Sequence, residues 1–332
     1  MENNKELFSQ IDNFLKNFSG KRIIISGHIN TDFDCLGSIL SFYKILKEFY
    51  KKDTYVFLER NVYDYVFQKV TERASINVIT EDSNIDFNSF DLLVTLDTSD
   101  WKRVPEFLRD YTKNLPKLVI DHHGDNERFG DLNIIIPGAA ATGVIVYNFA
   151  KFIDYNIDKV FAELIYITIL GDTGRFAYSN TTKEVFDIVS ELCETGIDCS
   201  EIYRVLFSNE SPIKYKLLSY VLDNMELLLD GKLCLFKLPQ SIVEKYNASK
   251  SDTEGFVDYT LKLRGVKIGV MAYIYEDKNE VKYSLRAVKG INLRDIVKVF
   301  GGGGHPQAAG CRINGAFEET WEKLLKEIKK YV

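Results

Sequence analysis

Acidic residues and histidines gather in four short segments of this 332-residue sequence, and each segment follows a run of apolar residues. Carboxylates and imidazoles are common ligands of divalent cations. The five carboxylates could not converge without cations, because like charges repel and raise one another's pKa. The sequence therefore predicts a metal centre built from His28, Asp32, Asp34, Asp97, Asp121, His122, His123 and Asp172.

The first segment, GHINTDFDCLGS, follows the buried-strand pattern RIIIS and holds His28, Asp32 and Asp34 within seven residues. Locally extended backbone would point the two aspartates to the same side. One imidazole with two carboxylates suits Mn²⁺ or Mg²⁺. The alternative is a loop whose aspartates cap the next helix. This segment alone does not decide between the two.

Two metal ions in one site indicate a class of reaction. Cations about 3.5 to 4 Å apart can activate a water molecule and hold the attacking and leaving oxygens of a displacement at phosphorus. Hydrolysis of a phosphate ester is therefore the reaction that these residues favour. A histidine that binds no metal could stabilise the phosphoryl oxygens or protonate the leaving group, and His123 is the candidate.

A glycine run, GGGGHPQAAG at residues 301–310, stands near the end of the chain. Such a run is often a flexible linker. Here it follows the helix-like LRDIVKVF and precedes small residues that could begin a helix. We therefore expect a backbone that binds an anion.

The elements that must position these residues alternate between strand and helix patterns. RIIIS, YVFL, DLLVTLD and KLVIDHH are strand-like, with helix-like stretches among them. This pattern predicts an α/β fold with a mainly parallel sheet flanked by helices, where ligands collect beyond the carboxyl ends of the strands. From Thr182 to about Asn224 the sequence has helical patterns without strand signals, and strand patterns begin again after that stretch. We predict a first domain at 1–185, a helical linker at 186–224, a smaller α/β domain at 225–332, and a cleft between the domains.

Composition excludes several classes of protein. Apolar residues make up 45% of the chain, and no segment approaches the roughly 20 apolar residues of a membrane span. The polar N-terminal residues do not resemble a secretory signal, so we expect a cytoplasmic protein without a membrane partner. A net charge of −6 argues against duplex DNA as a partner. The five scattered cysteines, without a CxxC pair, are interpreted as reduced structural thiols.

In their order and spacing, these motifs resemble those of the DHH/DHHA1 phosphoesterase family, in particular its stand-alone bacterial enzymes that degrade very short RNAs and 3′-phosphoadenosine 5′-phosphate. The matching motifs of the first domain are GHINTDFDCLGS, LDTSDWKR, DHH and GDTGRF. The second domain matches at TEG (253–255), SLRA (284–287) and GGGGHPQAAG. The resemblance implies a catalytic DHH domain, a substrate-binding DHHA1 domain, and hydrolysis of short RNA or dinucleotides to 5′-mononucleotides.

The resemblance also implies a role for each residue. Two Mn²⁺ ions per chain would be bound, with Mg²⁺ or Co²⁺ as substitutes. One ion would be held by His28, Asp32 and Asp97, and the other by Asp34, Asp97, His122 and Asp172. His123 and Arg103 would lie at the scissile phosphate, while Asp121 would orient a histidine. The distant phosphate or nucleotide would be bound by Arg286, Gly302, Gly303, Gly304 and His305.

The chain departs from the family pattern at positions beside these ligands. Thr31 and Phe33 stand where Pro and Gly are usual, so Phe33 could reshape the loop or the pocket wall. Ala287 stands where Ser is common, which would remove a hydrogen bond to phosphate, and Val144 where Glu often follows. Every ligand position is intact. These departures bear on substrate preference.

Alternative functions stay open. A soluble phosphodiesterase for cyclic dinucleotides such as cyclic di-AMP would use the same metal centre. A non-catalytic nucleotide-binding module would be expected to lack a metal ligand, and none is missing. A family II pyrophosphatase would lack GGGGHPQAAG. The sequence leaves open whether the chain forms a homodimer.

Overall fold

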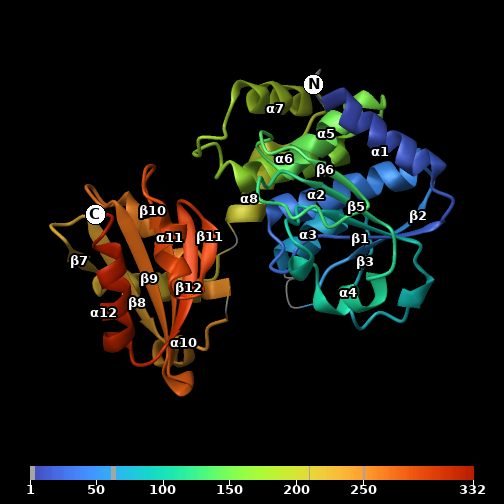
Figure 1. The fold of residues 1–332 in the computed structure, drawn as a ribbon. Coiled ribbons are helices and arrows are strands. Elements are labelled where there is room, and N and C mark those ends of the chain that lie inside the picture. Colours follow the sequence, from blue (N-terminus) through green and yellow to red (C-terminus); the bar gives the residue numbers. More distant parts are fainter. Residues whose placement is uncertain (1–3, 61–64, 209, 250) are drawn as a thin grey trace. The chain divides into compact units, whose positions relative to one another are not determined.

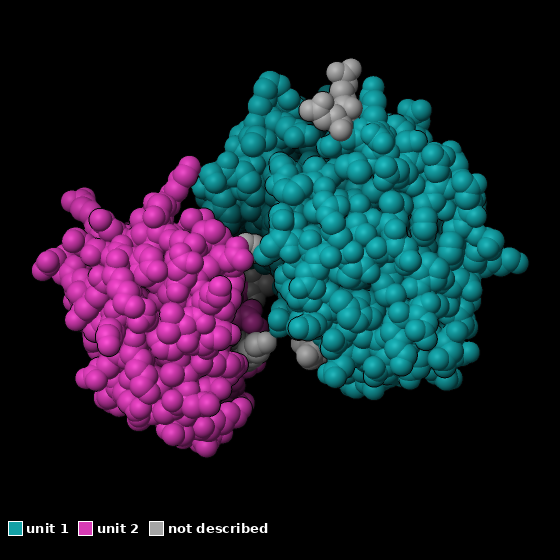
Figure 2. Space-filling view, viewed as in Figure 1, with its two compact units in different colours: residues 1–208 teal, residues 209–332 magenta. Residues whose placement is uncertain are grey.

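The chain folds into two compact units, residues 1–208 and 209–332, each with its own sheet (Figures 1 and 2). The computed structural model describes residues 4–60, 65–208, 210–249 and 251–332. Among these residues, no helix has both the length and the apolar character needed to cross a membrane.

The first unit is built on a sheet of six parallel strands in the order β3-β2-β1-β4-β5-β6. The expected mainly parallel sheet is confirmed. From β1 the chain adds β2 and β3 on one side, and it then returns to add β4, β5 and β6 on the other side. Ligand sites in such sheets lie at this switch point, between β1 and β4. The strands are β1 (Arg22–Ser26), β2 (Asp53–Phe57), β3 (Val78–Ile79), β4 (Leu92–Leu96), β5 (Lys117–Asp121) and β6 (Leu132–Ile135).

Helices cover both faces of this sheet because its side chains alternate between faces. Ile23 and Ile25 of β1 join the core on the side of α1, α2, α5 and α6, whereas Ile24 joins a second core with Leu108 of α4. The helices are α1 (Lys5–Asn17), α2 (Phe33–Lys44), α3 (Tyr65–Arg73), α4 (Glu106–Thr112), α5 (Thr142–Phe152), α6 (Lys159–Asp172), α7 (Lys183–Glu194) and α8 (Cys199–Phe207). Shorter helical segments are the π-helix η2 (Ile45–Phe49), which continues α2, and the 3₁₀ helices η3 (Phe87–Ser89) and η4 (Trp101–Arg103).

Helix α2 lies between the sheet and α6, and it also contacts α5. Its residues from Asp34 to Lys44 are buried, so its sequence is apolar on almost every side. This central position carries Asp34 into the interior of the unit.

The second unit is a mixed sheet in the order β11-β12-β10-β9-β8-β7, in which β8 and β9 are parallel. Its strands are β7 (Glu226–Leu228), β8 (Leu233–Pro239), β9 (Ile268–Tyr275), β10 (Glu280–Ala287), β11 (Gly303–His305) and β12 (Ala308–Asn314). Its helices and turns are α9 (Pro212–Asp223), α10 (Gln240–Lys245), η5 (Ser251–Thr253), η6 (Phe256–Lys262), η7 (Glu276–Lys278), α11 (Leu293–Lys298) and α12 (Phe317–Ile328).

Two details differ from the sequence-based expectations. The stretch 186–224, expected as a helical linker, is divided between the units: α7 and α8 belong to the first, and α9 to the second. The small residues after the glycine run begin a strand, β12, and not a helix. Gly303–His305 pairs antiparallel with Ala308–Gly310, so backbone pairing in a hairpin decides this segment.

Candidate metal centre

Three neighbouring strands deliver the predicted ligands to one edge of the first sheet. His28 follows β1, Asp97 follows β4, and β5 ends at Asp121, directly before His122. Because β1, β4 and β5 are adjacent and parallel, their carboxyl ends meet at the switch point of the sheet. The alternation of strand and helix in the sequence thus creates the site.

The loop after β1 both caps a helix and faces the site. Asp32 is the N-cap of α2, where its Oδ1 accepts the backbone N–H of Cys35 at 3.0 Å. Its Oδ2 lies 3.7 Å from His28 Nε2. The capping interpretation is therefore correct, and the same carboxylate also lies beside His28, where the ligand interpretation places it. The expected extended backbone is wrong beyond Asp32, because Asp34 lies in the first turn of α2.

The carboxylate of Asp34 is held by hydrogen bonds from the start of α5. Oδ2 accepts the backbone N–H of Thr142 at 2.7 Å, and Oδ1 accepts that of Gly143 at 3.0 Å and the Ser38 hydroxyl at 3.0 Å. The residue that precedes Thr142 is an alanine without a capping side chain, so Asp34 supplies the cap from another helix. Sequence reasoning missed Ser38, Thr142 and Gly143.

Asp97 lies at the middle of the cluster, and its two oxygens face different histidines. Oδ2 is 3.4 Å from His28 Nε2, and Oδ1 is 3.7 Å from His122 Nε2. The Thr142 hydroxyl donates to Oδ1 at 3.1 Å. Asp97 has a left-handed backbone with φ of 55°, which aspartate tolerates better than most residues. This turn directs the side chain back over the strand ends.

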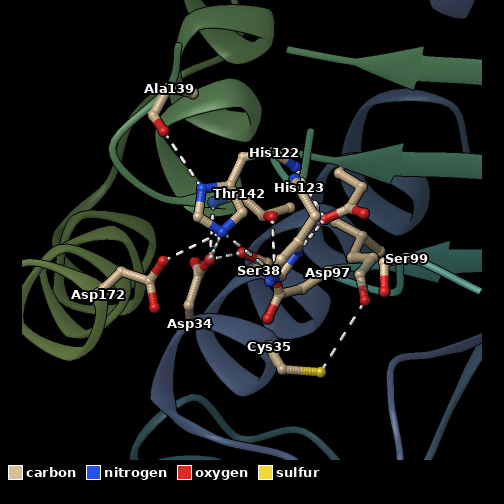
Figure 3. A network of polar contacts seen from close by, with 12 residues as sticks. Asp34, Cys35, Ser38, Asp97, Ser99, His122, His123, Ala139, Thr142 and Asp172 are labelled. Atoms are coloured by element: carbon tan, nitrogen blue, oxygen red, sulfur yellow. Dashed lines mark hydrogen bonds and ion pairs between the residues drawn. The ribbon is translucent and has the colours of Figure 1, made fainter. Parts of the chain in front are cut away.

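Backbone carbonyls fix the orientation of two histidine rings. His28 Nδ1 lies 2.6 Å from the Ile29 carbonyl, and His122 Nδ1 lies 3.2 Å from the Ala139 carbonyl. An N–H at each Nδ1 leaves Nε2 as the atom that faces the carboxylates, as in many metal-binding histidines. His122 Nε2 is 3.1 Å from Oδ2 of Asp172, the last residue of α6 (Figure 3).

His123 is oriented by a carboxylate. Its Nδ1 donates to Asp121 Oδ1 at 2.8 Å, and it lies 3.5 Å from Asp97 Oδ1. The second oxygen of Asp121 accepts from Asn126 Nδ2 at 2.7 Å, and the same amide donates to the Thr98 carbonyl at 2.9 Å. Although burial opposes ionisation of Asp121, the hydrogen bond from His123 lowers its pKa. Asn126 was not predicted from the sequence.

Asn180 connects two loops that carry ligands. Its Nδ2 donates to the Ala140 carbonyl at 2.9 Å and to the Asp172 carbonyl at 3.0 Å. Ala140 follows the residue whose carbonyl orients His122. Asn180 therefore fixes the positions of Asp172 and His122 together, and no sequence motif pointed to it.

The charges of the cluster fit bound cations. Burial raises the pKa of Asp34 well above its usual value, and Asp97 and Asp172 add to the effect. Although burial disfavours the imidazolium, nearby carboxylates raise the pKa of both His28 and His122 to about 10. Without metal, protons must therefore supply the positive charge of the site. Three overlapping groups, each with ligand atoms within 4.8 Å of one another, could hold a metal: His28, Cys35 and Asp97; Asp97, His122 and His123; and Asp34, His122 and Asp172.

Cys35 borders the cluster and was not predicted as a site residue. Its thiol is fully buried, and Sγ lies 3.9 Å from the Leu96 carbonyl. Burial raises its pKa well above the usual value, with Asp97 and Asp32 adding to the shift. We therefore treat Cys35 as a neutral thiol beside the ligands, because thiolate is the form that binds metals.

Phe33, between the two ligand aspartates, contributes to an aromatic cluster. Its ring lies 5.4 Å from that of Phe207 in α8 and 6.1 Å from that of Phe67 in α3. Val144 packs in the core of the first unit. The Arg103 guanidinium lies 3.5 Å from the hydroxyl of Ser99, two residues beyond Asp97.

In the second unit, Arg286 is held by Asp258 of η6, whose Oδ1 accepts from Nε at 2.8 Å. Ala287 points the opposite way along β10, into the core, so a serine there would not face the same side as Arg286. A Cβ at Gly302 would meet the Gly310 carbonyl at 2.3 Å, and one at Gly304 the Ala308 carbonyl at 2.5 Å. Strand packing thus requires these glycines, whereas Gly303 has open space. The side chain of His305 lies outside the described part of the structure.

Comparison with known proteins identifies the family of this chain. The DHH family N-terminal domain matches residues 22–169, and the DHHA1 domain matches residues 232–332. The chain is 26% identical to the bifunctional oligoribonuclease and PAP phosphatase NrnA of Bacillus subtilis, over 88% of this chain and 89% of that protein. It is 27% identical to NrnA of Thermus thermophilus, over 93% of this chain and 89% of that protein.

The crystal structure of an exopolyphosphatase-related protein from Bacteroides fragilis has the same fold, with a TM-score of 0.84 and 26% identity over 98% of this chain and 96% of that one. The fold and the site define a hydrolase that acts on phosphate or phosphodiester bonds. The chain belongs to the DHH/DHHA1 phosphoesterase family, as the motifs indicated.

Proposed function

We propose that this protein is a Mn²⁺-dependent phosphodiesterase that hydrolyses very short oligoribonucleotides to 5′-mononucleotides, and that it also hydrolyses 3′-phosphoadenosine 5′-phosphate. The observation that carries the proposal is the convergence of Asp34, Asp97, His122 and Asp172 with His28 at one sheet edge. The names of the Bacillus and Thermus relatives support this choice of substrate.

We assign the proposed ligands to two ions according to the Asp97 oxygen that each group lies near. His28 and Asp32 lie on the side of Oδ2, and would hold one ion with it. The second ion would be held on the side of Oδ1, by Asp34, Asp97, His122 and Asp172. Mixed oxygen and imidazole ligands suit Mn²⁺, with Mg²⁺ or Co²⁺ as substitutes. When bound, such ions activate water and neutralise charge on the phosphate.

The remaining residues of the first unit would act on the substrate directly. His123 is held by Asp121 with its ring at the edge of the ligand cluster, where it would stabilise the phosphoryl oxygens or protonate the leaving oxygen. Arg103 would add positive charge at the same phosphate. In these roles both residues would contact the phosphate of the substrate and no particular base. This suits an enzyme that accepts many short sequences.

The second unit would bind the far end of the substrate. Arg286 is fixed by Asp258, and the backbone at Gly303 is open, so a phosphate could approach both. Gly302 and Gly304 would shape this backbone, and His305 would contact the terminal nucleotide. A binding site for one terminal nucleotide favours substrates of a few nucleotides over long chains.

A turnover panel tests the proposal. The full chain with Mn²⁺ is assayed on pApA, a short oligoribonucleotide, 3′-phosphoadenosine 5′-phosphate, cyclic di-AMP and pyrophosphate, and kcat/KM values are compared. We expect the linear ribonucleotides to give the highest values, with measurable release of phosphate from 3′-phosphoadenosine 5′-phosphate. Preference for cyclic di-AMP would replace the proposal with a cyclic-dinucleotide phosphodiesterase. No turnover on any compound would indicate a nucleotide-binding module.

A further inference from the structure

Two cysteines of the first unit lie side by side at the turn between α7 and α8. Cys193 is in the last turn of α7, and Cys199 is the first residue of α8. Their sulfur atoms are 3.6 Å apart. The other three cysteines, Cys35, Cys234 and Cys311, are buried, whereas Cys193 is exposed and Cys199 is half-buried.

We propose that Cys193 and Cys199 form an oxidation-sensitive dithiol that closes reversibly to an intramolecular disulfide. A disulfide needs its sulfur atoms about 2.05 Å apart, so the two sulfurs must approach by roughly 1.5 Å from their present separation of 3.6 Å. The turn at 195–198 holds the two helix ends together, with Gly196 in a left-handed conformation. For this pair, the proposal differs from the interpretation of all five cysteines as structural thiols.

The environment assigns different roles to the two sulfurs. Tyr166 of α6 faces the Cys199 thiol. Burial is the main cause that raises the pKa of the Tyr166 phenol, and the nearby Cys199 adds to the shift, so the hydroxyl remains a hydrogen-bond donor. Burial and the neighbouring Cys199 raise the pKa of Cys193. Cys199 is accordingly the sulfur that reacts with the oxidant first, and Cys193 is the sulfur that then attacks Cys199 to form the disulfide.

The oxidant is a hydroperoxide. The Cys199 sulfur attacks one peroxide oxygen, so an S–O bond forms and the O–O bond breaks; the thiol proton passes to the departing oxygen, which leaves as an alcohol or water. The Cys193 sulfur then attacks the Cys199 sulfur, so the S–S bond forms and the S–O bond breaks; the Cys193 proton passes to the departing hydroxide, which leaves as water. Two thiols lose two electrons and the peroxide gains them. An external dithiol reverses the reaction by exchange.

The closed pair would clamp the two helices that pack against the metal-ligand turns. Phe186 of α7 stacks on Phe176, four residues beyond Asp172, with ring centres 5.6 Å apart. Phe207 of α8 contacts Phe33, which lies between Asp32 and Asp34. Oxidation at this surface turn would thus restrain elements that support both sides of the metal centre.

Peptide mass spectrometry on the full chain tests the proposal. Trypsin leaves both cysteines in one peptide, residues 184–204, because no Lys or Arg lies between them. The reduced protein is exposed to hydrogen peroxide, unfolded, alkylated with N-ethylmaleimide and digested. We expect this peptide to lose two hydrogens and take up no alkylating agent, while the peptides of Cys35, Cys234 and Cys311 are alkylated. Dithiothreitol should restore both labels.

Two variants and one further measurement keep the proposal falsifiable. In Cys193→Ser, Cys199 should gain oxygen and the loss of two hydrogens should disappear; Cys199→Ser should leave Cys193 as an alkylated thiol. Amide hydrogen exchange at 195–198 should slow at least tenfold on oxidation of the wild type and stay unchanged in either variant. Two alkylated cysteines after peroxide, sulfinic acid in the wild type, or disulfide-linked dimers on a non-reducing gel would each overturn the proposal.

Discussion

The Asp34 carboxylate accepts the backbone N–H of Thr142 at 2.7 Å, although the two residues are 108 positions apart in the chain. This contact joins the start of α2 to the start of α5 in the interior of the first unit. The contact satisfies a backbone N–H at the start of α5, and at the same time it fixes the position of a predicted metal ligand. The predicted metal centre is therefore part of the packing of the unit, and loss of a predicted ligand or a supporting residue should affect both metal binding and stability.

Asp97→Asn should lower kcat by about 10³-fold, because both predicted ions share this carboxylate. The bound metal, measured by elemental analysis, should fall in parallel. Asp110→Asn, at an exposed aspartate in α4, is the matched control and should retain activity. Near-normal turnover by the Asp97 variant would exclude a shared ligand.

Removal of metal should destabilise the first unit, because Asp34, Asp97 and Asp172 then face one another with only protons to offset their charge. Mn²⁺ at about 100 times its Kd should add ~2.7 kcal/mol of stability. For a unit of 208 residues, this should raise the Tm of the chelator-treated protein by about 5–10 °C. The shift should shrink in Asp172→Asn. If Mn²⁺ left the Tm of the wild-type protein unchanged, this result would contradict the metal site.

Asn180→Ala should weaken Mn²⁺ binding or activity by about tenfold to a hundredfold, because its amide holds the Ala140 and Asp172 carbonyls in place. Titration of activity against Mn²⁺ would reveal the change as a higher metal requirement. The exposed Asn13 of α1 offers the control substitution. If the Mn²⁺ titration of the Asn180 variant matched that of the wild type, the amide would have no part in ligand placement.

Asp121→Asn should lower kcat by about tenfold to a hundredfold with bound metal nearly unchanged, since Asp121 orients His123 and faces Asn126. Steady-state kinetics with elemental analysis separates this outcome from loss of metal. A variant that lost both ions would show that Asp121 supports the ligands and not His123.

Arg286→Ala should raise KM by about tenfold with kcat within about twofold, because its contact to the substrate is made in the ground state and the transition state alike. Asp258→Ala should produce a smaller rise, since the guanidinium remains but loses its partner at 2.8 Å. Arg264, exposed in the same unit, is the control. An unchanged KM for every nucleotide tested would remove Arg286 from the substrate site.

The order of apolar and polar residues along the chain is enough to predict the first sheet and which residues gather at its edge. Short apolar runs that alternate with helical stretches specify parallel strands, and each polar residue directly after a strand must lie at the same edge. The pattern therefore places His28, Asp97 and His122 together. Helix α2 begins earlier than expected because Asp32 caps it, a local choice between extended and capped backbone that the pattern left open.

The distant groups that complete the site depend on how the elements pack in three dimensions. Ser38, Thr142, Asn126 and Asn180 hold the predicted site residues through one or two hydrogen bonds each, and such residues carry no periodic signal. The role of the glycine run likewise depended on pairing between β11 and β12, because strand pairing is a contact between segments and not a property of either. The pairing of Cys193 with Cys199 arose from the turn between two helices, which brings the thiols within 3.6 Å.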